Sequence, residues 1–424
     1  MSALDASQTA EQIGALIGAD RVRAAASESE RTIAGVVVEP ASADEIAELV
    51  RKCETEHITL APFGAARTLA EIRHSPVDVA VSLARMSHVV AYEPDDMTVI
   101  AEAGHTLEAL NGHLAERGQC LPADPPFPNL TTLGSLIAAA KAGPIRLSEG
   151  TVRDLLIGIR FVGHGGRIVH GGGQVVKNVA GYDLMKVMTG SFGTLGIITE
   201  ATFKVRPAPT NYALALTSFM NTGQAFEAAG GLSNAIPLIH LEIISPGFDA
   251  KFGRSGRFLM LAGFGGSGAE VQYLRTRIAE VLGSGAETEL LEGADAESAY
   301  EWLRDIDVRG AALVAQMAVL PAELGRCLDQ CGSEFRAHAG SGVAQMFLGG
   351  EPSAEAIYRE AERWREAAHG AQGHLRILAA SPGSRGDLNF FDEPPAGTLN
   401  LMGRMKAAFD PAGIFNPGCF VGGL

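Results

Sequence analysis

The stretch GSFGTLGIITE (residues 190–200) places three glycines within seven positions and then continues as an apolar segment. Gly190, Gly193 and Gly196 carry no side chain where a helix or strand would normally have one. Because glycine loses more conformational freedom on folding than other residues, such a cluster marks tight turns or the close approach of another group to the backbone. From Ile197 to Val205 apolar and polar residues alternate, which predicts a half-buried strand after the turn.

The region before this turn alternates strand and helix patterns. GVVVEP (35–40) predicts a buried strand and ITLAPFG (58–64) a returning strand. The helix between them is predicted to start at Ser42, because Glu45 three residues later completes a capping box. Further strands are predicted at residues 77–83, 89–94, 97–104, 154–163 and 165–173.

The segment RPAPT (206–210) breaks the strand pattern and predicts a domain boundary. Beyond it, residues 257–283 predict a strand, a turn and an amphipathic helix, and residues 353–370 predict a second helix with a solvated charged face. The last helix stops at Asp410-Pro411, and we expect it to pack on the first domain. No internal repeat is evident in the sequence. A length of 424 residues fits two or three domains.

Charge and cysteine usage exclude several classes of protein. The net charge of −15 would repel a phosphate backbone, so nucleic-acid binding is not expected. Five cysteines without CxxC spacing argue against a disulfide framework or an iron–sulfur site, and Cys327 and Cys331 are expected to pack on one helix face. We find no signal peptide and no apolar run long enough to span a membrane. We expect a cytoplasmic protein, which partner chains can hold at the inner face of the membrane.

One segment of the sequence matches a dinucleotide-binding motif. Gly263, Gly265 and Gly268 in GFGGSG satisfy GxGxxG after a strand and before a helix. In a Rossmann half these glycines would let a pyrophosphate approach the helix N-terminus. A plain strand-to-helix turn is the alternative, and no second Rossmann half accompanies the pattern.

Four glycine-bearing loops before residue 210 form a more specific pattern: PFGAART (62–68), TTLGS (131–135), SEGTVRD (148–154) and GSFGTLGIIT (190–199). In order and text they resemble the FAD-binding domain of the vanillyl-alcohol oxidase and p-cresol methylhydroxylase (PCMH) family. The strings VKNVAGYDL, GSFGTLGIITE and FDPAGIFNPG narrow the resemblance to the FAD-binding E subunits of bacterial glycolate oxidases. The resemblance implies an α+β fold, in which residues 1–208 with 405–424 form a two-part PCMH-type FAD-binding domain and residues 209–404 a ferredoxin-like cap.

The resemblance also implies a role for each loop. The first loop would wrap the pyrophosphate, the segment from Pro122 would run near the flavin ring, and residues 131–135 would meet the pyrophosphate or ribitol with helix amides behind them. Residues near 150 would turn beneath the flavin, and the strand after Gly196 would hold adenine by main-chain groups. The implied cofactor-binding residues are Phe63, Gly64, Ala65, Ala66, Arg67, Thr68, Pro122, Ala123, Asp124, Pro125, Thr131, Thr132, Gly134, Ser135, Gly150, Thr151, Arg153, Gly196, Ile197 and Ile198. Any one of these loops taken alone could be an ordinary turn.

The first loop departs from the family pattern. Much of the family has three glycines there, whereas this chain has Gly64-Ala65-Ala66-Arg67. We hypothesise that the Arg67 guanidinium replaces lost amide contacts by charge-assisted hydrogen bonds to the pyrophosphate, the alternative being an arginine that points to solvent. The loop contains no histidine, so we expect FAD to be bound non-covalently.

The second departure concerns catalysis. Relatives that oxidise 2-hydroxy acids carry a metal-binding string of the type HAGDGNLH, whereas this chain reads HAGSGVAQ at 338–345. His338 remains, but Ser341 and Gln345 stand at the other ligand positions, so we expect no metal and assign no catalytic residue. His164, His170 and Tyr182 are acid–base candidates that could equally be structural.

The resemblance implies an FAD-binding subunit of a complex that oxidises glycolate or D-lactate. A related FAD-containing chain would oxidise the 2-hydroxy acid, and an iron–sulfur subunit would take the electrons. Two alternatives stay open: a self-sufficient, metal-free 2-hydroxyacid dehydrogenase, and a scaffold subunit that has lost its flavin.

Overall fold

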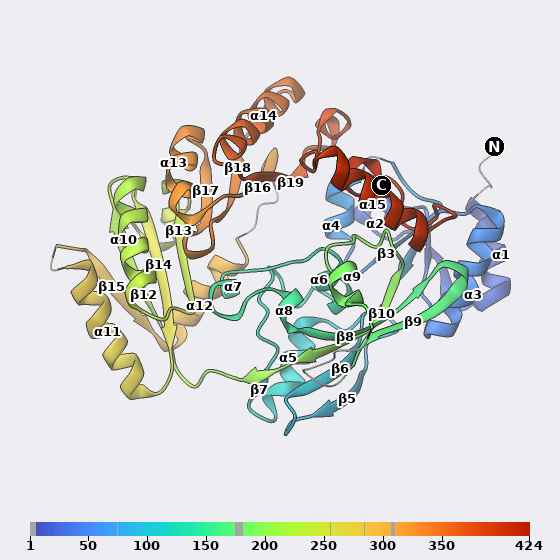
Figure 1. The fold of residues 1–424 in the computed structure, drawn as a ribbon, viewed down its shortest axis with the longest axis horizontal. Coiled ribbons are helices and arrows are strands. Elements are labelled where there is room, and N and C mark those ends of the chain that lie inside the picture. Colours follow the sequence, from blue (N-terminus) through green and yellow to red (C-terminus); the bar gives the residue numbers. More distant parts are fainter. Residues whose placement is uncertain (1–5, 74, 174–180, 255, 284, 307–309) are drawn as a thin grey trace. The chain divides into compact units, whose positions relative to one another are not determined.

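The computed structural model describes residues 6–73, 75–173, 181–254, 256–283, 285–306 and 310–424 (Figure 1). The chain divides into two compact units. The first comprises Met1–Ala142, Thr151–Ala208 and Glu393–Leu424, and the second Gly143–Gly150 and Pro209–Asp392. The second unit therefore ends before α15 (Ala396–Phe409), and the predicted boundary at 404 lies inside that helix. The roles predicted for the two domains stay predictions.

The first unit contains a four-stranded sheet with the order β1 (Val22–Ala24), β2 (Val36–Val38), β4 (Val79–Ser82), β3 (Leu60–Phe63). β1 is antiparallel to β2, and the other pairs are parallel. The predicted strand–helix–strand unit is confirmed, because α3 (Ala43–Glu56) links β2 to β3 and the Ser42 hydroxyl accepts the Glu45 amide at 3.2 Å. The accompanying helices are α1 (Ala6–Ile17), α2 (Glu28–Ile33) and α4 (Arg67–Ile72).

A five-stranded antiparallel sheet follows in the same unit, with the order β5 (Val89–Glu93), β6 (Thr98–Glu102), β10 (Ile197–Lys204), β8 (Leu156–Gly163), β9 (Arg167–Gly172). The sequence predicted that β10 is buried on its apolar face only. Ile198 and Thr202, which lie on the other face, are buried as well. The remaining elements are α5 (Leu107–Ala115), α6 (Leu133–Ala138), α8 (Val152–Leu155), α9 (Leu184–Met188) and the pair of β7 (Gln119–Cys120) with β11 (Arg206–Pro207). Residues 174–180, which include most of VKNVAGYDL, lie outside the described residues.

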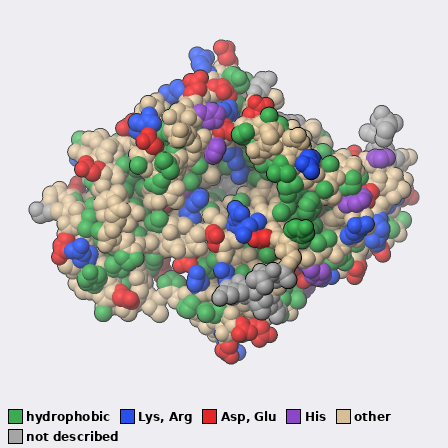
Figure 2. All heavy atoms as spheres, viewed as in Figure 1, with side chains coloured by type: hydrophobic (Ala, Val, Ile, Leu, Met, Phe, Trp, Pro, Cys, Tyr) green, Lys and Arg blue, Asp and Glu red, His purple; other side chains and the backbone are tan. Residues whose placement is uncertain are grey.

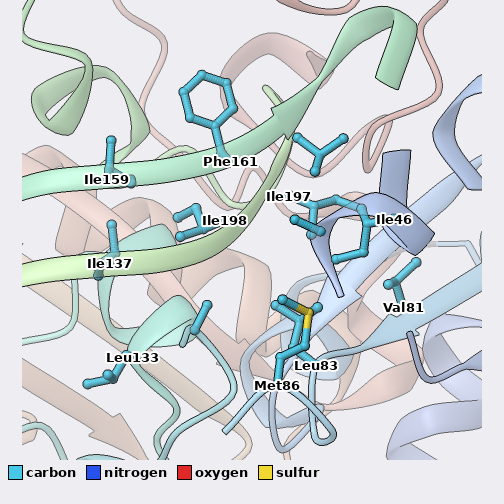
Figure 3. Close-up of a cluster of buried hydrophobic side chains, with 14 of the residues drawn as sticks. Ile46, Val81, Leu83, Met86, Leu133, Ile137, Ile159, Phe161, Ile197 and Ile198 are labelled. Atoms are coloured by element: carbon cyan, nitrogen blue, oxygen red, sulfur yellow. The ribbon is translucent and has the colours of Figure 1, made fainter. Parts of the chain in front are cut away.

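One hydrophobic core joins the two sheets of the first unit. Figure 3 shows Ile46 of α3 and Val81 of β4 together with side chains of α6, β8 and β10, among them Phe161. Phe161 and Ile197 are almost fully buried. Burial of such side chains contributes roughly 1.5–3 kcal/mol each, so this core fixes the loops that leave its strands.

The second unit is built on an eight-stranded antiparallel sheet. Its strands, in spatial order, are β15 (Thr288–Glu292), β12 (Tyr212–Phe219), β14 (Phe258–Gly265), β13 (His240–Ile244), β17 (Glu334–His338), β18 (Val343–Leu348), β16 (Leu313–Ala318) and β19 (His374–Ala380). The helices are α7 (Arg146–Glu149), α10 (Thr222–Ala235), α11 (Gly268–Leu282), α12 (Gly293–Arg304), α13 (Pro321–Cys331) and α14 (Ala354–Gly370).

This sheet contains two consecutive βαββαβ motifs. The first runs β12–α10–β13–β14–α11–β15 and the second β16–α13–β17–β18–α14–β19, and β13 pairs with β17 where they meet. Each motif has the ferredoxin-like strand order 4-1-3-2, so the ferredoxin-like expectation is confirmed and extended to a tandem pair. The sequence showed no repeat, because the two copies share a topology and not a residue pattern. Cys327 and Cys331 are buried on α13, as predicted, and burial raises the pKa of Cys331 to about 11.

The GxGxxG segment lies at the end of β14 and has a packing role. Gly263 pairs with His240 of β13, and a Cβ on Gly263 would lie 2.1 Å from His240 Nε2. A Cβ on Gly265 would lie 2.5 Å from the Asn211 carbonyl oxygen, whereas Gly268 has open space around it. The first two glycines therefore make room for the protein's own groups, and the plain-turn interpretation explains the pattern.

None of the helices in the described segments is long and apolar enough to cross a membrane. On the face shown in Figure 2, acidic and basic side chains are interspersed over the described surface.

We predict that Gly263→Ala destabilises the second unit by about 1–3 kcal/mol, because the new methyl group overlaps His240 in a packed sheet. Both tryptophans, Trp302 and Trp364, lie in this unit, so urea unfolding followed by tryptophan fluorescence measures it. Gly268→Ala is the matched control and should leave the unfolding midpoint within error or raise it. Equal behaviour of the two variants would contradict this explanation of the glycine pattern.

Candidate functional site

The turn between β3 and α4 carries six of the predicted cofactor residues, Phe63 to Thr68. Ala66 adopts a left-handed backbone with φ of 63°, and α4 starts at Arg67 without a side-chain cap. The main-chain amides of Ala65, Ala66 and Thr68 have no hydrogen-bond acceptor among the described residues. Amides without an acceptor at a turn are suitable donors to an anionic group. The Arg67 side chain lies outside what the structure describes, so its role stays a hypothesis.

The second predicted loop touches this turn. A Cβ on Gly64 would lie 2.4 Å from Thr132 Oγ1 and 3.0 Å from Thr132 Cγ2. Thr132 is the N-cap of α6, where its hydroxyl accepts the Ser135 amide at 3.3 Å. Glycine is therefore required at position 64 for these two loops to be in contact.

The helix amides expected behind Thr131–Ser135 are not available. The Leu133 amide donates to the His105 carbonyl at 2.9 Å, and the Gly134 amide donates to the Ala103 carbonyl at 2.8 Å. With the Ser135 amide bound to Thr132, the first three amides of α6 are satisfied within the protein. This part of the prediction is wrong, and the β3–α4 turn offers the amide donors instead.

The turn at 190–196 lies against both of these elements. The Gly190 and Phe192 amides donate to the carbonyls of Ile137 and Ala138, the last two residues of α6. Gly193, with φ of 71°, leaves no room for a Cβ, which would lie 2.6 Å from Pro62 Cγ. A Cβ on Gly196 would lie 2.7 Å from the Val162 carbonyl oxygen. Gly193 and Gly196 are thus required by the protein's own packing, before any cofactor is considered.

The three loops 62–68, 131–135 and 190–196 therefore form one contiguous surface, which we call the three-loop cradle. A buried polar atom lies in it: Ser191 is 4% exposed, and its Oγ has no hydrogen-bond partner in the described part of the chain. A buried hydroxyl without a partner is costly, and a polar ligand would satisfy it. The glycines, the acceptor-free amides and this hydroxyl fit a phosphate-bearing cofactor.

Two further sets of predicted residues, the segment Pro122–Pro125 and the pair Ile197 and Ile198, follow or precede the cradle loops in the chain. The Thr131 hydroxyl donates to the Pro126 carbonyl at 3.1 Å, which ties the segment Pro122–Pro125 to the second loop. β6 pairs with β10 only from Glu200 onward in the described sheet, so the main-chain edge of Ile197 and Ile198 that faces away from β8 is not taken by a strand.

The third predicted loop is divided between the two units. Thr151 caps α8, with Asp154 Oδ2 accepting its amide at 2.8 Å, and α8 packs near α6 of the first unit. Arg153 is exposed. Gly150 belongs to the second unit, and its role stays a prediction.

The three acid–base candidates of the first unit do not converge. His164 Nδ1 donates to Glu54 Oε1 at 2.8 Å, and the same carboxylate accepts the Gly165 amide, so His164 links the turn after β8 to α3. His170 is exposed on β9, and Tyr182 is 91% exposed. We therefore assign no catalytic role to His164, His170 or Tyr182.

In the second unit, the residues of HAGSGVAQ make internal contacts. His338 Nδ1 donates to Glu242 Oε1 at 2.7 Å, and both side chains are buried. Outside the string HAGSGVAQ, His338 therefore has an acidic neighbour that comes from another strand of the sheet, β13. Gln345 Oε1 accepts from the Arg336 guanidinium at 2.6 Å. No group of three or more His, Cys, Asp or Glu side chains among the described residues could hold a metal ion.

A second buried histidine lies on the same strand as Glu242. Tyr212 donates its hydroxyl to His240 Nε2 at 2.7 Å, and Tyr300 packs on the same ring. Burial, with a smaller effect of His338, lowers the pKa of His240 to about 3, so this imidazole is neutral at pH 7. Sequence reasoning missed Glu242 and His240, because neither stands in a recognisable motif.

Comparison with known proteins identifies two segments of the chain. Residues 34–172 match the FAD binding domain, and residues 392–419 match the C-terminal domain of FAD linked oxidases. Among curated proteins, D-lactate dehydrogenase [cytochrome] of Arabidopsis thaliana is 26% identical over 91% of this chain and 73% of its own length. Glycolate oxidase subunit GlcE of Escherichia coli is 41% identical over 28% of this chain, a match that spans about a third (35%) of that protein.

Solved structures share the fold. Alkyldihydroxyacetonephosphate synthase superposes with a TM-score of 0.73 at 18% identity, covering 98% of this chain and 88% of the other. p-Cresol methylhydroxylase superposes with a TM-score of 0.71 at 15% identity, covering 97% and 96%. The fold is thus of the PCMH type. Residues 34–172 and 392–419 are thus similar to the two domains of FAD linked oxidases, and the cofactor that these matches indicate is FAD.

Proposed function

We propose that the three-loop cradle holds FAD non-covalently. The β3–α4 turn would donate the amides of Ala65, Ala66 and Thr68 to the pyrophosphate, and the Ser191 hydroxyl would gain the partner that it lacks among the described residues. The edge of Ile197 and Ile198 that β6 does not pair with would hold adenine through main-chain groups. The Pro122–Pro125 segment would lie along the flavin ring, with Thr151 and Arg153 beneath it. The first loop has no histidine that could form a covalent link.

Bound FAD supplies the capacity to take up and release electrons. The protein's own residues bind and orient it. Gly64 lets the backbone of the first loop lie against Thr132, and Gly193 lets the third loop lie against Pro62, so both loops keep one fixed separation. Such preorganisation lowers the entropic cost of binding.

We further propose that this chain is the GlcE-type subunit of a complex that oxidises glycolate or D-lactate to the 2-oxo acid. A related FAD-containing subunit would carry out the oxidation, and an iron–sulfur subunit would accept the electrons. The match to Glycolate oxidase subunit GlcE and that to Glycolate oxidase subunit GlcD of Bacillus subtilis, 29% identical over 46% of this chain, support the proposal. The complex would be cytoplasmic, or held at the inner membrane face by its partners.

One observation carries this division of labour. The position at which relatives have the second metal-binding histidine is occupied by Gln345, which accepts a hydrogen bond from Arg336, and His338 is bound to Glu242. Gln345 and His338 are thus each engaged by a neighbour in the sheet, whereas Glu242 Oε2 is buried without a hydrogen-bond partner among the described residues. No residue of HAGSGVAQ is left to polarise a substrate hydroxyl through a metal.

The second candidate is a self-sufficient, metal-free 2-hydroxyacid dehydrogenase. The alignment with D-lactate dehydrogenase [cytochrome] over most of the chain favours it. The flavin-free scaffold is not proposed, because residues 34–172 match the FAD binding domain.

The two candidates differ when the isolated chain meets substrate. We predict that the visible flavin absorption of the purified chain stays unchanged on anaerobic addition of glycolate or D-lactate, because the residues of HAGSGVAQ offer no metal site that would activate the hydroxyl. Dithionite should bleach the same sample, which shows that the flavin can be reduced. Bleaching by either 2-hydroxy acid alone would contradict the relay role and establish the dehydrogenase.

We also predict that Gly64→Ala weakens FAD binding about tenfold or more, equivalent to about 1.4 kcal/mol. The new methyl group would overlap Thr132 Oγ1 and force the first two loops apart. The measurement is a fluorescence titration of apoprotein, prepared by acid release of the flavin, with FAD.

Gly112→Ala in α5 is the matched control, since a Cβ there meets no atom within 4 Å, and its affinity should equal that of the unmodified chain. Thr132→Ala combined with Gly64→Ala should recover part of the affinity, because the clashing atoms are gone. Unchanged affinity in Gly64→Ala would argue that FAD does not depend on this contact.

A further inference from the structure

The C-terminal segment 406–419, which we call the C-terminal clasp, covers the edge of the sheet from which the first cradle loop leaves. β3 is the edge strand of the four-stranded sheet. The Leu60 amide donates to the Ile414 carbonyl at 2.9 Å, and the Asn416 amide donates to the Leu60 carbonyl at 2.7 Å, so Leu60 and Phe415 form a parallel bridge. Phe415 is fully buried beside β3. The clasp thus adds a single parallel bridge to the β3 edge of this sheet.

Lys406 connects the clasp to the third cradle loop. Its ammonium donates to the Thr194 carbonyl at 2.7 Å, to the Phe415 carbonyl at 2.8 Å and to Asp410 Oδ2 at 2.6 Å. Asp410 is buried, and its carboxylate also accepts the amides of Ile414 and Phe415. All three N–H donors of the ammonium are used. These hydrogen bonds fix the ammonium between the end of α15, the residues that follow it and the third cradle loop.

Asn416 makes the second connection. Its side-chain amide donates to the Phe192 carbonyl in the third cradle loop. Its Oδ1 accepts from the Arg73 guanidinium, and Arg73 ends the helix α4 that follows the first cradle loop. Asn416 is fully buried and Arg73 is 4% exposed, so these bonds form away from water. One amide side chain therefore spans the elements that carry two of the three cradle loops.

We propose that Lys406 and Asn416 are positioning residues for the cofactor, which hold the 62–68 and 190–196 loops at the separation that FAD binding requires. The inference rests on the proposed assignment of FAD to the three-loop cradle. Neither side chain needs to touch FAD, because each acts through the carbonyls and the helix that it holds. Coupling of this kind is reciprocal, so bound FAD also stabilises the docked clasp.

The variants must distinguish two effects: the loss of the contacts that position the loops, and the destabilisation caused by a buried charge without its partner. Lys406→Met alone would leave the Asp410 carboxylate buried without its cation, which destabilises the fold by itself. Lys406→Met combined with Asp410→Asn removes that charge and still cuts the link to Thr194. We expect this double variant and Asn416→Ala to bind FAD about tenfold or more weakly in apoprotein titrations, since each loses buried hydrogen bonds that order the loops.

Two variants serve as controls. Lys52→Met removes a lysine that pairs with Glu56 on α3, away from the cradle loops, and should leave FAD affinity unchanged. Lys406→Arg keeps a cation and should retain part of the affinity that Lys406→Met loses.

A measurement on the unmodified full chain covers the case in which variants fail to fold. Adding FAD to apoprotein should slow hydrogen exchange in residues 406–419 as well as in the cradle loops. Protection of the loops without protection of 406–419, or wild-type FAD affinity in folded Asn416→Ala and Lys406→Met with Asp410→Asn, overturns the inference. If the unmodified apoprotein binds no FAD at all, the proposed function fails instead.

Discussion

The arrangement of the first unit depends on backbone segments approaching more closely than side chains would permit. Gly64 lies against Thr132, and Gly193 lies against Pro62, at distances where a Cβ could not fit. These two approaches bring three turns that are far apart in the sequence into one surface. The hydrophobic core beneath them, with Phe161 and Ile197, keeps the supporting strands from moving apart.

The same contacts show which features the sequence could reveal. Local patterns predicted the β2–α3–β3 unit, its Ser42 cap and the helices α11 and α14, because these depend on residues close together in the chain. The glycines predicted the positions of the cradle turns, but the explanation that they make room for a cofactor was incomplete. Gly193 and Gly196 are required by Pro62 and by the Val162 carbonyl, partners that no local pattern identifies.

Features that depend on distant partners were not predictable. The acceptors that satisfy the α6 amides, His105 and Ala103, come from a loop some thirty positions earlier in the chain, so the helix N-terminus looked available when it was not. Glu242 and His338 are 96 residues apart and meet only because β13 pairs with β17. The tandem ferredoxin-like motifs escaped notice because topology can repeat without similar residues. The roles of the loops in holding FAD still rest on resemblance and fit.

We propose that the β3–α4 turn, with its acceptor-free amides, receives the pyrophosphate of FAD in the three-loop cradle. A crystal structure of the full chain with FAD tests this most directly. We expect pyrophosphate oxygens within about 3 Å of the amides of Ala65, Ala66 or Thr68, with the Ser191 hydroxyl hydrogen-bonded to the cofactor or to a water molecule bound to it. A pyrophosphate bound elsewhere, with this turn empty, would contradict it.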